Sequence, residues 1–364
     1  MPNSMIITPY THESRRIRVM LVEDSATELY LLQKMFSGAP DIEVIATARN
    51  GREALELLPS VQPDIVCTDY HMPVMDGLEF IIRAMKEHPC AILVLSAWVQ
   101  PTQKDNIFRL LSAGALDVLA KPLGTTEGIG HKEGALLLDA IRGIARSPAL
   151  TGKLTRPTPA RLNAVGPTVV TRSVKQVKLV ALGASTGGPQ ILQRILSQLP
   201  GDYAAPIVCI QHISEGFLDG MISWMQSSCK VRLELAQAGV TPRAGHVYFA
   251  PDGHHLTLNA YGRFTFGERL NPDVHCPSID QLFKSVAKNC GASTVGVLLS
   301  GMGHDGAKGL KSMFDAGATT IAQDEATSII FFGMPGTAIE LGAAKNVLPT
   351  DEIAAMLVRL VGST

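Results

Sequence analysis

The sequence predicts an α/β protein made of two doubly wound parallel-sheet domains. In both halves of the chain, short apolar runs alternate with amphipathic stretches, the pattern of repeated strand–helix units. A proline-containing segment with little apolar periodicity separates the halves. The 364 residues are enough for two domains, and 46% hydrophobic against 18% charged residues is typical of globular chains.

Five apolar runs in the first half have the length and composition of strands. They are Ile17–Glu23, Ile42–Ala46, Asp64–Asp69, Ala91–Ser96 and Leu116–Ala120. Helical patterns such as Arg52–Leu58 and Leu78–Lys86 lie between them. The alternation predicts one parallel sheet covered by helices on both faces.

The predicted boundaries give a tail at 1–16, a first domain at 17–145, a linker at 146–175 and a second domain at 176–364. No acidic residue occurs between Asp139 and Asp202. The resulting positive charge could form a docking strip for an acidic partner, but solvation of an exposed tether explains it more simply. The scattered prolines predict a semi-stiff linker.

The second half repeats the alternation with strand candidates at Val177–Gly183, Pro206–His212 and Val295–Ser300. Each is followed by a helical pattern, so a second parallel sheet is expected. Three other runs alternate more strongly between apolar and polar residues and are interpreted as inserted antiparallel hairpins. These runs are Val247–Ala250, His255–Leu258 and Arg263–Gly267.

Composition argues against several classes of protein. The net charge of −1 gives no reason to expect nucleic acid or an anionic membrane as a partner. No apolar run is long enough to cross a bilayer, and the first sixteen residues lack the apolar core of a signal peptide. The six cysteines show no Cys-x-x-Cys pair or zinc spacing, so we expect reduced cysteines and a cytoplasmic location.

Polar side chains follow four strands of the first predicted sheet. Glu23 and Asp24 follow the first strand, Asp69 ends the third, Ser96 ends the fourth, and Lys121 follows the fifth. The carboxyl ends of parallel strands meet at one edge, so these groups are expected to converge there. Clustered carboxylates need a compensating cation, and oxygen ligands suit Mg²⁺. An Asp beside that ion could attack a phosphoryl donor.

Residues 17–145 resemble the response-regulator receiver family in the strings VMLVEDS, DIVCTDYHMPVMDG, LVLSA and ALDVLAKP. The resemblance implies a flavodoxin-like fold and phosphorylation of Asp69. It also implies Mg²⁺ binding by Glu23, Asp24 and Asp69, a switch hydroxyl at Ser96 and a phosphate partner at Lys121. The chain departs from the family at Val118, where many receivers have an aromatic switch residue, and in the Tyr70-His71 pair.

The second half carries the residue types of a serine hydrolase at three strand ends. Ser185 lies in the glycine-rich turn GASTGG between a strand and a helix, a place that brings a hydroxyl close to a helix N-terminus. His212 ends the next strand, and Asp305 follows Val295–Ser300. In acyl transfer, His212 would take the Ser185 proton and Asp305 would orient the imidazole. The order Ser, His, Asp disfavours the α/β-hydrolase fold.

Other functions fit the sequence less well. The glycine-rich turn also resembles a dinucleotide site, but the next strand ends in Ile210-Gln211-His212 without the acidic residue that holds the ribose. The second half has no Tyr-x-x-x-Lys pair either. A DNA-binding effector would need a basic recognition helix, and a hydrolase-derived scaffold would need a broken triad.

Residues 177–361 resemble the catalytic domain of the chemotaxis protein-glutamate methylesterase family. The matching strings include ALGASTGGP, CIQHI, YFAPDGHHL, PSIDQLFKSVA and VLLSGMGHDGAKGL. The resemblance implies a Rossmann-like fold, with Ser185 as nucleophile, His212 as base and Asp305 as its orienter. Thr186 and the backbone of Met302 would shape the oxyanion site.

The same resemblance implies a reaction, partners and a form of control. The expected reaction is hydrolysis of glutamate methyl esters, and deamidation of glutamines, on chemoreceptors, with no cofactor for the esterase step. A chemotaxis histidine kinase would supply the phosphoryl group. We expect the unphosphorylated first domain to pack over the catalytic mouth. An extra Phe at 331–332 is a departure that could alter the substrate lip.

Overall fold

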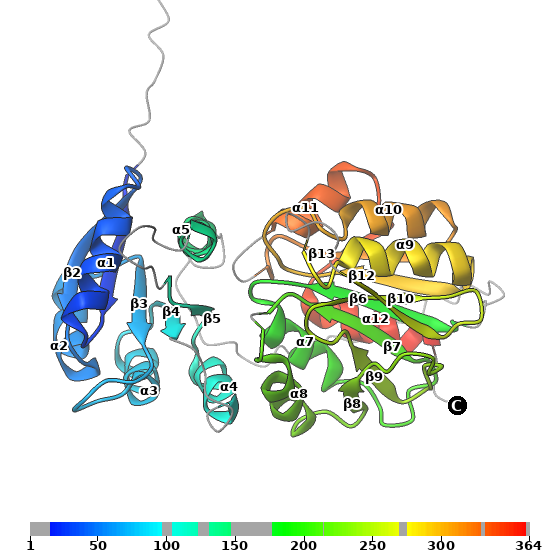
Figure 1. Cartoon of the computed structure of the whole chain (residues 1–364), viewed down its shortest axis with the longest axis horizontal. Helices are drawn as coiled ribbons and strands as arrows, with labels where there is room; N and C mark the ends of the chain where they lie inside the picture. The colour runs from blue at the N-terminus through cyan, green and yellow to red at the C-terminus, as the bar shows by residue number, and fades with distance from the viewer. Residues whose placement is uncertain are drawn as a thin grey trace, which may run out of the picture.

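The computed structural model describes residues 15–96, 104–122, 131–146, 177–213, 215–268, 275–328 and 332–361. Nearly all of the predicted tail and all of the predicted linker beyond residue 146 lie outside these ranges, as does Phe331 of the Phe331–Phe332 pair. The described residues form two sheets with helices on their faces (Figure 1). The predicted fold class, α/β with two doubly wound parallel sheets, is confirmed.

The first sheet has five parallel strands in the order β2-β1-β3-β4-β5. The strands are β1 (Ile17–Val22), β2 (Ile42–Ala48), β3 (Ile65–Asp69), β4 (Ala91–Ser96) and β5 (Asp117–Ala120). The helices are α1 (Ala26–Ser37), α2 (Gly51–Val61), α3 (Gly77–Glu87), α4 (Lys104–Ala113) and α5 (His131–Arg146). All five strands were predicted, with ends that differ by at most two residues.

Alternate residues of these strands point to opposite faces, and both faces are covered. Val19 and Leu21 pack with residues of α1 and α5, such as Phe36 and Ile141. Met20 and Val22 pack on the other side with residues of α2, α3 and α4. Burial on both faces explains why the strands are continuous apolar runs in the sequence.

The second sheet has seven strands in the order β14-β13-β12-β6-β7-β9-β8, and every pairing is parallel. Its strands are β6 (Leu179–Ala184), β7 (Ile207–Gln211), β8 (Arg232–Leu235), β9 (His246–Phe249), β12 (Thr294–Leu298), β13 (Thr319–Gln323) and β14 (Asn346–Leu348). The helices are α7 (Gly188–Leu196), α8 (Leu218–Gln226), α9 (Ile279–Cys290), α10 (Ala307–Asp315), α11 (Gly333–Glu340) and α12 (Thr350–Val361), with a 3₁₀ turn, η2 (Gly291–Ser293).

An inserted antiparallel hairpin, β10 (His254–Leu258) with β11 (Phe264–Glu268), is present as predicted. The prediction that Val247–Ala250 belongs to the hairpins was wrong, because β9 pairs in parallel with β7 and β8 inside the main sheet. Its residues Val247, Tyr248 and Phe249 are all buried. A four-residue strand is too short for periodicity to distinguish these alternatives.

The two domains meet through helices that lie between their sheets (Figure 1). Helix α4 of the first sheet contacts α8 of the second. The Phe108 and Trp224 rings stack with centroids 5.5 Å apart, and Trp224 Nε1 donates to Ser112 Oγ at 2.8 Å. Phe108 and Leu192 belong to one continuous cluster of buried apolar residues, so the apolar contact runs from one sheet to the other.

Candidate active site and phosphorylation site

The strand order of the second sheet brings Ser185, His212 and Asp305 to one edge. Strand β6 lies between β7 and β12, and the chain leaves β6 toward β7, then later returns to β12 on the other side. Ligands of open α/β sheets bind at such a reversal, beyond the carboxyl ends of the strands. Ser185 follows β6, His212 follows β7, and Asp305 lies in the loop after β12. The structure therefore brings the three predicted residues together at the reversal.

The turn that carries Ser185 is tightly fixed. The Ser185 N–H donates to the Ser300 carbonyl at 3.0 Å, and the Ser185 carbonyl accepts from Gly188 N–H at 2.7 Å. Gly187 has a φ of 76°, which favours glycine. A Cβ on Gly188 would lie 2.1 Å from Gln211 Oε1, so a larger residue cannot fit there without movement of that amide. Ser185 lies just before the N-terminus of α7, and it is 7% exposed in the intact chain.

His212 and Asp305 lie at ion-pair distance. The Nε2 of His212 is 3.0 Å from Asp305 Oδ2, although the ring N–H is not aimed well enough for an aligned hydrogen bond. The Nδ1 of His212 is buried and has no hydrogen-bond partner among the described residues. Because Nε2 faces Asp305, Nδ1 is the nitrogen left to exchange a proton with Ser185.

Asp305 is held by the start of α9. Its Oδ2 accepts from Ile279 N–H at 2.7 Å, and its Oδ1 accepts from Ser278 Oγ and Asp280 N–H, both at 3.0 Å. Burial alone would raise the pKa of Asp305, but His212 and the backbone N–H groups of α9 outweigh it and lower the pKa to about 2. The carboxylate is therefore fixed in position and ionised.

Three residues near the triad were missed by the sequence argument. His275 stacks on His212 with ring centroids 4.3 Å apart and an interplanar angle of 15°. Gln211 is buried, and its Nε2 donates to the carbonyls of Ser185 at 2.7 Å and His212 at 2.8 Å. Gln323 Oε1 accepts from Ser300 N–H at 2.8 Å. These contacts form only in the folded chain, and no spacing in the sequence points to them.

The predicted oxyanion residues line the same edge. The Thr186 carbonyl accepts from Ser300 Oγ at 3.1 Å, and Thr186 is half-buried. Met302 is half-buried too, in the loop after β12, where the Gly301 carbonyl accepts from Met334 N–H at 3.0 Å. Because a Cβ on Gly301 would lie 2.6 Å from Ser185 Cβ, the Met302 loop runs close to Ser185.

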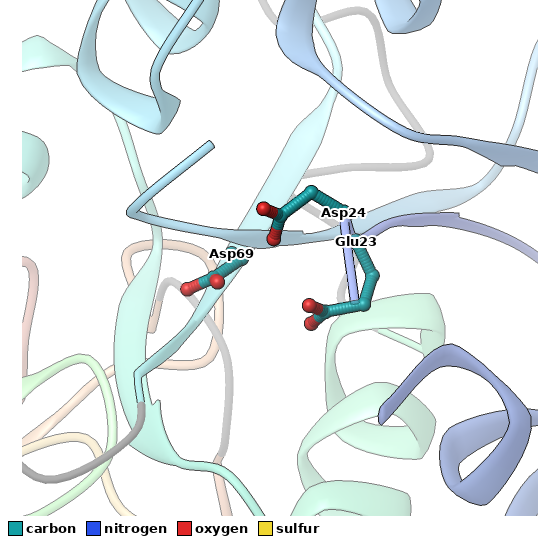
Figure 2. Close-up of side chains that lie close together, drawn as sticks. All are labelled: Glu23, Asp24 and Asp69. Atoms are coloured by element: carbon teal, nitrogen blue, oxygen red, sulfur yellow. The ribbon is translucent and has the colours of Figure 1, made fainter. Parts of the chain in front are cut away.

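The acidic residues of the first sheet also meet at a reversal of strand order. β1 lies between β2 and β3, Glu23 and Asp24 follow β1, and Asp69 ends β3. One oxygen from each carboxylate lies within 4.8 Å of the others, around a common space (Figure 2). Glu23 and Asp69 are buried, whereas Asp24 is exposed and leaves room for water. Three oxygen donors beside solvent fit a hard cation such as Mg²⁺.

Lys121 completes this cluster. Its Nζ lies 2.8 Å from Glu23 Oε2 and 2.9 Å from Asp69 Oδ2. The carboxylate of Glu28 in α1 lies 2.5 Å from the same Nζ, and Glu28 was not among the predicted site residues. Burial raises the pKa of Glu23, and the Lys121 ammonium lowers it only in part. Ser96 is buried at the end of β4, on the same sheet edge.

The first domain reaches the Ser185 turn directly. Asp117 of β5 accepts hydrogen bonds from its neighbour Val118 N–H at 2.8 Å and from Gly187 N–H at 3.4 Å. Gln190 Nε2 on α7 donates to the Ala115 carbonyl at 2.5 Å. Burial raises the pKa of Asp117 to about 6, and its two backbone hydrogen bonds only partly counter this. A carboxylate of the first sheet thus lies at the N-terminus of the helix that follows Ser185.

No described helix is both long and apolar enough to cross a membrane.

Comparison with known proteins divides the chain into the same two domains as the structure does. A family model described as CheB methylesterase matches residues 180–357, and one described as response regulator receiver domain matches residues 19–131. A protein-glutamate methylesterase/protein-glutamine glutaminase 1 of Syntrophus aciditrophicus is 40% identical over 95% of this chain and 99% of its own length. A protein-glutamate methylesterase/protein-glutamine glutaminase 2 of Anaeromyxobacter dehalogenans is 41% identical over 93% of this chain and 95% of its own.

Among solved structures, the Thermotoga maritima CheB methylesterase catalytic domain is 36% identical and covers 50% of this chain and 98% of its own, with a TM-score of 0.49. The response regulator domain of Thermotoga maritima CheB is 30% identical and covers 36% of this chain and 97% of its own, with a TM-score of 0.33.

Proposed function

The chain belongs to the protein-glutamate methylesterase/protein-glutamine glutaminase family, and we propose that it hydrolyses glutamate methyl esters on chemoreceptors under the control of Asp69 phosphorylation. The observation that carries the proposal is the His212–Asp305 pair, 3.0 Å apart at the sheet reversal where Ser185 also lies. Deamidation of receptor glutamines would use the same groups. The protein would act in the cytoplasm, where the receptors present their methylated helices.

In the proposed reaction Ser185 Oγ attacks the γ-carbonyl carbon of the ester. His212 Nδ1 takes the hydroxyl proton and then gives it to the methoxide, which leaves as methanol. A water molecule, deprotonated by His212, attacks the acyl-serine and regenerates Ser185 and the glutamate carboxylate. A glutamine side chain would follow the same path with ammonia as the leaving group.

Asp305 would act through His212. Its pKa of about 2 keeps it ionised at neutral pH, so it stabilises the imidazolium that forms when Ser185 loses its proton. Backbone N–H groups at Thr186 and Met302 would receive the oxyanion, because both segments border the Ser185 turn.

The first domain would be phosphorylated on Asp69 by a chemotaxis histidine kinase. Glu23, Asp24 and Asp69 would hold Mg²⁺, which when bound offsets the negative charge between the carboxylate and the incoming phosphoryl group. Lys121 would pair with a phosphoryl oxygen, and the Ser96 hydroxyl would donate to another.

Control would be exerted where the first domain meets the Ser185 turn. Asp117 and Ala115 contact Gly187 and Gln190 in the intact, unphosphorylated chain, and Ser185 is 7% exposed. A methylated receptor helix cannot approach Ser185 while this packing persists. Phosphorylation would favour a second arrangement in which the two domains separate at this face.

The test of the hydrolase is release of methanol from membranes that contain methylated receptors. We expect the intact protein to release methanol and Ser185→Ala to lose at least about 1,000-fold of that rate, because the nucleophile is gone. Ser197→Ala is the matched control, since the Ser197 hydroxyl donates to the Arg194 carbonyl at 3.4 Å, at the end of α7 opposite the Ser185 turn. Equal rates for both variants would contradict the assignment of Ser185.

A further inference from the structure

We propose that Glu28 restrains the phosphorylation of Asp69 by holding the Lys121 ammonium that the phosphoryl group needs. The inference rests on the proposed phosphorylation of Asp69. It assigns a positioning role to Glu28, a residue of α1 that lies outside the group of three carboxylates placed to hold a cation.

Three carboxylates surround the Lys121 ammonium, and Nζ donates a hydrogen bond to Glu28 Oε2, whereas Glu23 Oε2 accepts no hydrogen bond among the described residues. An ammonium has three N–H donors, and Nζ has three carboxylate neighbours, in Glu23, Asp69 and Glu28 at 2.8, 2.9 and 2.5 Å. The shortest of these contacts is to Glu28. Burial alone would lower the pKa of Lys121, but its carboxylate partners raise it above the usual range, so the ammonium stays charged. A phosphoryl oxygen that pairs with Nζ competes most directly with the Glu28 hydrogen bond.

Glu28 is the partner most easily displaced. The Glu23 side chain is 2% exposed and that of Glu28 is 29% exposed, so only the latter can turn toward water. Glu28 sits on the side of Lys121 where Leu31, Leu32 and Pro122 line a small hollow. Its place is fixed by the helix, because Ser25 caps α1 by accepting a hydrogen bond from Glu28 N–H at 3.3 Å.

The net negative charge around Lys121 also indicates that Glu28 opposes phosphorylation of Asp69. Glu23, Asp24, Asp69 and Glu28 give four carboxylates against the one Lys121 ammonium, which leaves three excess negative charges when all are ionised. A phosphoryl group carries about −1.5 to −2, and because the Asp69 carboxylate loses its own charge on phosphorylation, the cluster becomes more negative by about 0.5 to 1. Mg²⁺ would offset two of the three negative charges of the carboxylates that surround it, but Glu28 lies outside that set and opposes the phosphoryl group through Lys121. Without the Glu28 charge, both the repulsion and the competition for Lys121 decrease.

The experiment uses the full chain, Mg²⁺ and beryllofluoride, which binds an aspartate as a phosphoryl mimic. ¹⁹F NMR titration gives the affinity for beryllofluoride directly. We expect Glu28→Gln to bind it about 3- to 10-fold more tightly than the wild type at low ionic strength, and to be phosphorylated faster by a small phosphodonor. The gain should shrink as ionic strength rises toward about 0.5 M, because screening weakens a charge effect but not a purely structural one.

Glu79→Gln is the matched control, because Glu79 pairs with Arg83 at 2.6 Å on α3, away from Lys121. It should bind like the wild type. Glu28→Ala serves as a second variant if the amide perturbs the helix, with far-UV circular dichroism as the check on folding. An affinity that is unchanged or weaker in both Glu28 variants, or a gain that does not depend on salt, would overturn the inference. If the wild type itself does not bind beryllofluoride with Mg²⁺, the phosphorylation proposal fails and this inference with it.

Discussion

Asp305 illustrates how one residue can serve both the fold and the proposed chemistry. Its carboxylate accepts hydrogen bonds from Ser278, Ile279 and Asp280 at the start of α9 and lies beside His212. The same contacts that cap the helix therefore hold the carboxylate against the imidazole. Asp305 was predicted from the sequence because this residue follows an apolar strand. The capping contacts were not predicted, because they join segments that are 25 to 27 residues apart.

We expect Asp305→Asn to lower the rate of methanol release by about 100- to 10,000-fold, because the imidazolium loses its counter-charge and its fixed orientation. The amide nitrogen also cannot accept the hydrogen bonds at α9, so the free energy of unfolding should fall by about 1–3 kcal/mol in urea denaturation. Asp280→Asn is the control. Among the described residues, the Asp280 side chain bonds Gly309 N–H at 2.6 Å and Lys284 Nζ at 3.3 Å and not His212, so this variant should lose stability while keeping most of its activity. Comparable losses of activity in both variants would show that Asp305 acts on folding alone.

At the scale of elements, the strands that were predicted best are those that form continuous apolar runs. β1, β3 and β4 are continuous apolar runs, and their ends placed Glu23, Asp24, Asp69 and Ser96 on one edge. Strand β9 was misassigned because four residues carry little periodicity. Strands β8, β13 and β14 were not predicted. β8 and β14 have only four and three residues, and three of the five residues of β13 (TTIAQ) are polar.

Contacts between elements were harder to predict than the elements. Glu28 is separated from Lys121 by 93 residues, and Asp117 from Gly187 by 70. In the sequence, Glu28 is typical of a residue on the exposed face of a helix. Asp117 is typical of a residue at the start of a strand. Both gain a role only from the three-dimensional arrangement, in which α1 borders the acidic cluster and β5 borders α7.

The contact between β5 and α7 leads to a prediction about pH. Burial raises the Asp117 pKa to about 6 in the intact chain, from a usual 3.8, and we expect separation of the domains to return it toward 3.8, so protonation favours packing. This contribution is fully present below about pH 4 and is lost as the pH rises through about 6. At pH 7.5 the ionised carboxylate opposes packing. Asp117→Asn should therefore pack more tightly and lower the unphosphorylated rate of methanol release several-fold.

The Asp117→Asn effect should diminish as the pH falls toward 5, where the wild-type carboxylate is protonated too. Measuring the ratio of the two rates at each pH cancels any pH dependence that the two proteins share. Asp139→Asn is the control, since Asp139 pairs with Arg142 on α5. A higher unphosphorylated rate in Asp117→Asn would mean that the ionised carboxylate holds α7 in place instead.

For the whole molecule, the arrangement of the two domains connects the proposed phosphorylation site to the proposed hydrolase site. Each site lies at a reversal of strand order, as expected for open parallel sheets. The first domain contacts the second through α4 and β5, the elements that follow β4, where Ser96 lies. A change at Asp69 and Ser96 can therefore reach the contact with α7 through neighbouring strands and helices.

The most direct test compares methanol release from methylated receptor membranes by the wild type and by Asp69→Asn, each with and without a small phosphodonor and Mg²⁺. We expect both proteins to show a low basal rate and only the wild type to be stimulated, by at least about tenfold, since a shift of about 1.4 kcal/mol between packed and separated arrangements changes their ratio tenfold. Stimulation of Asp69→Asn, or no stimulation of an active wild type, would contradict control of Ser185 by phosphorylation at Asp69.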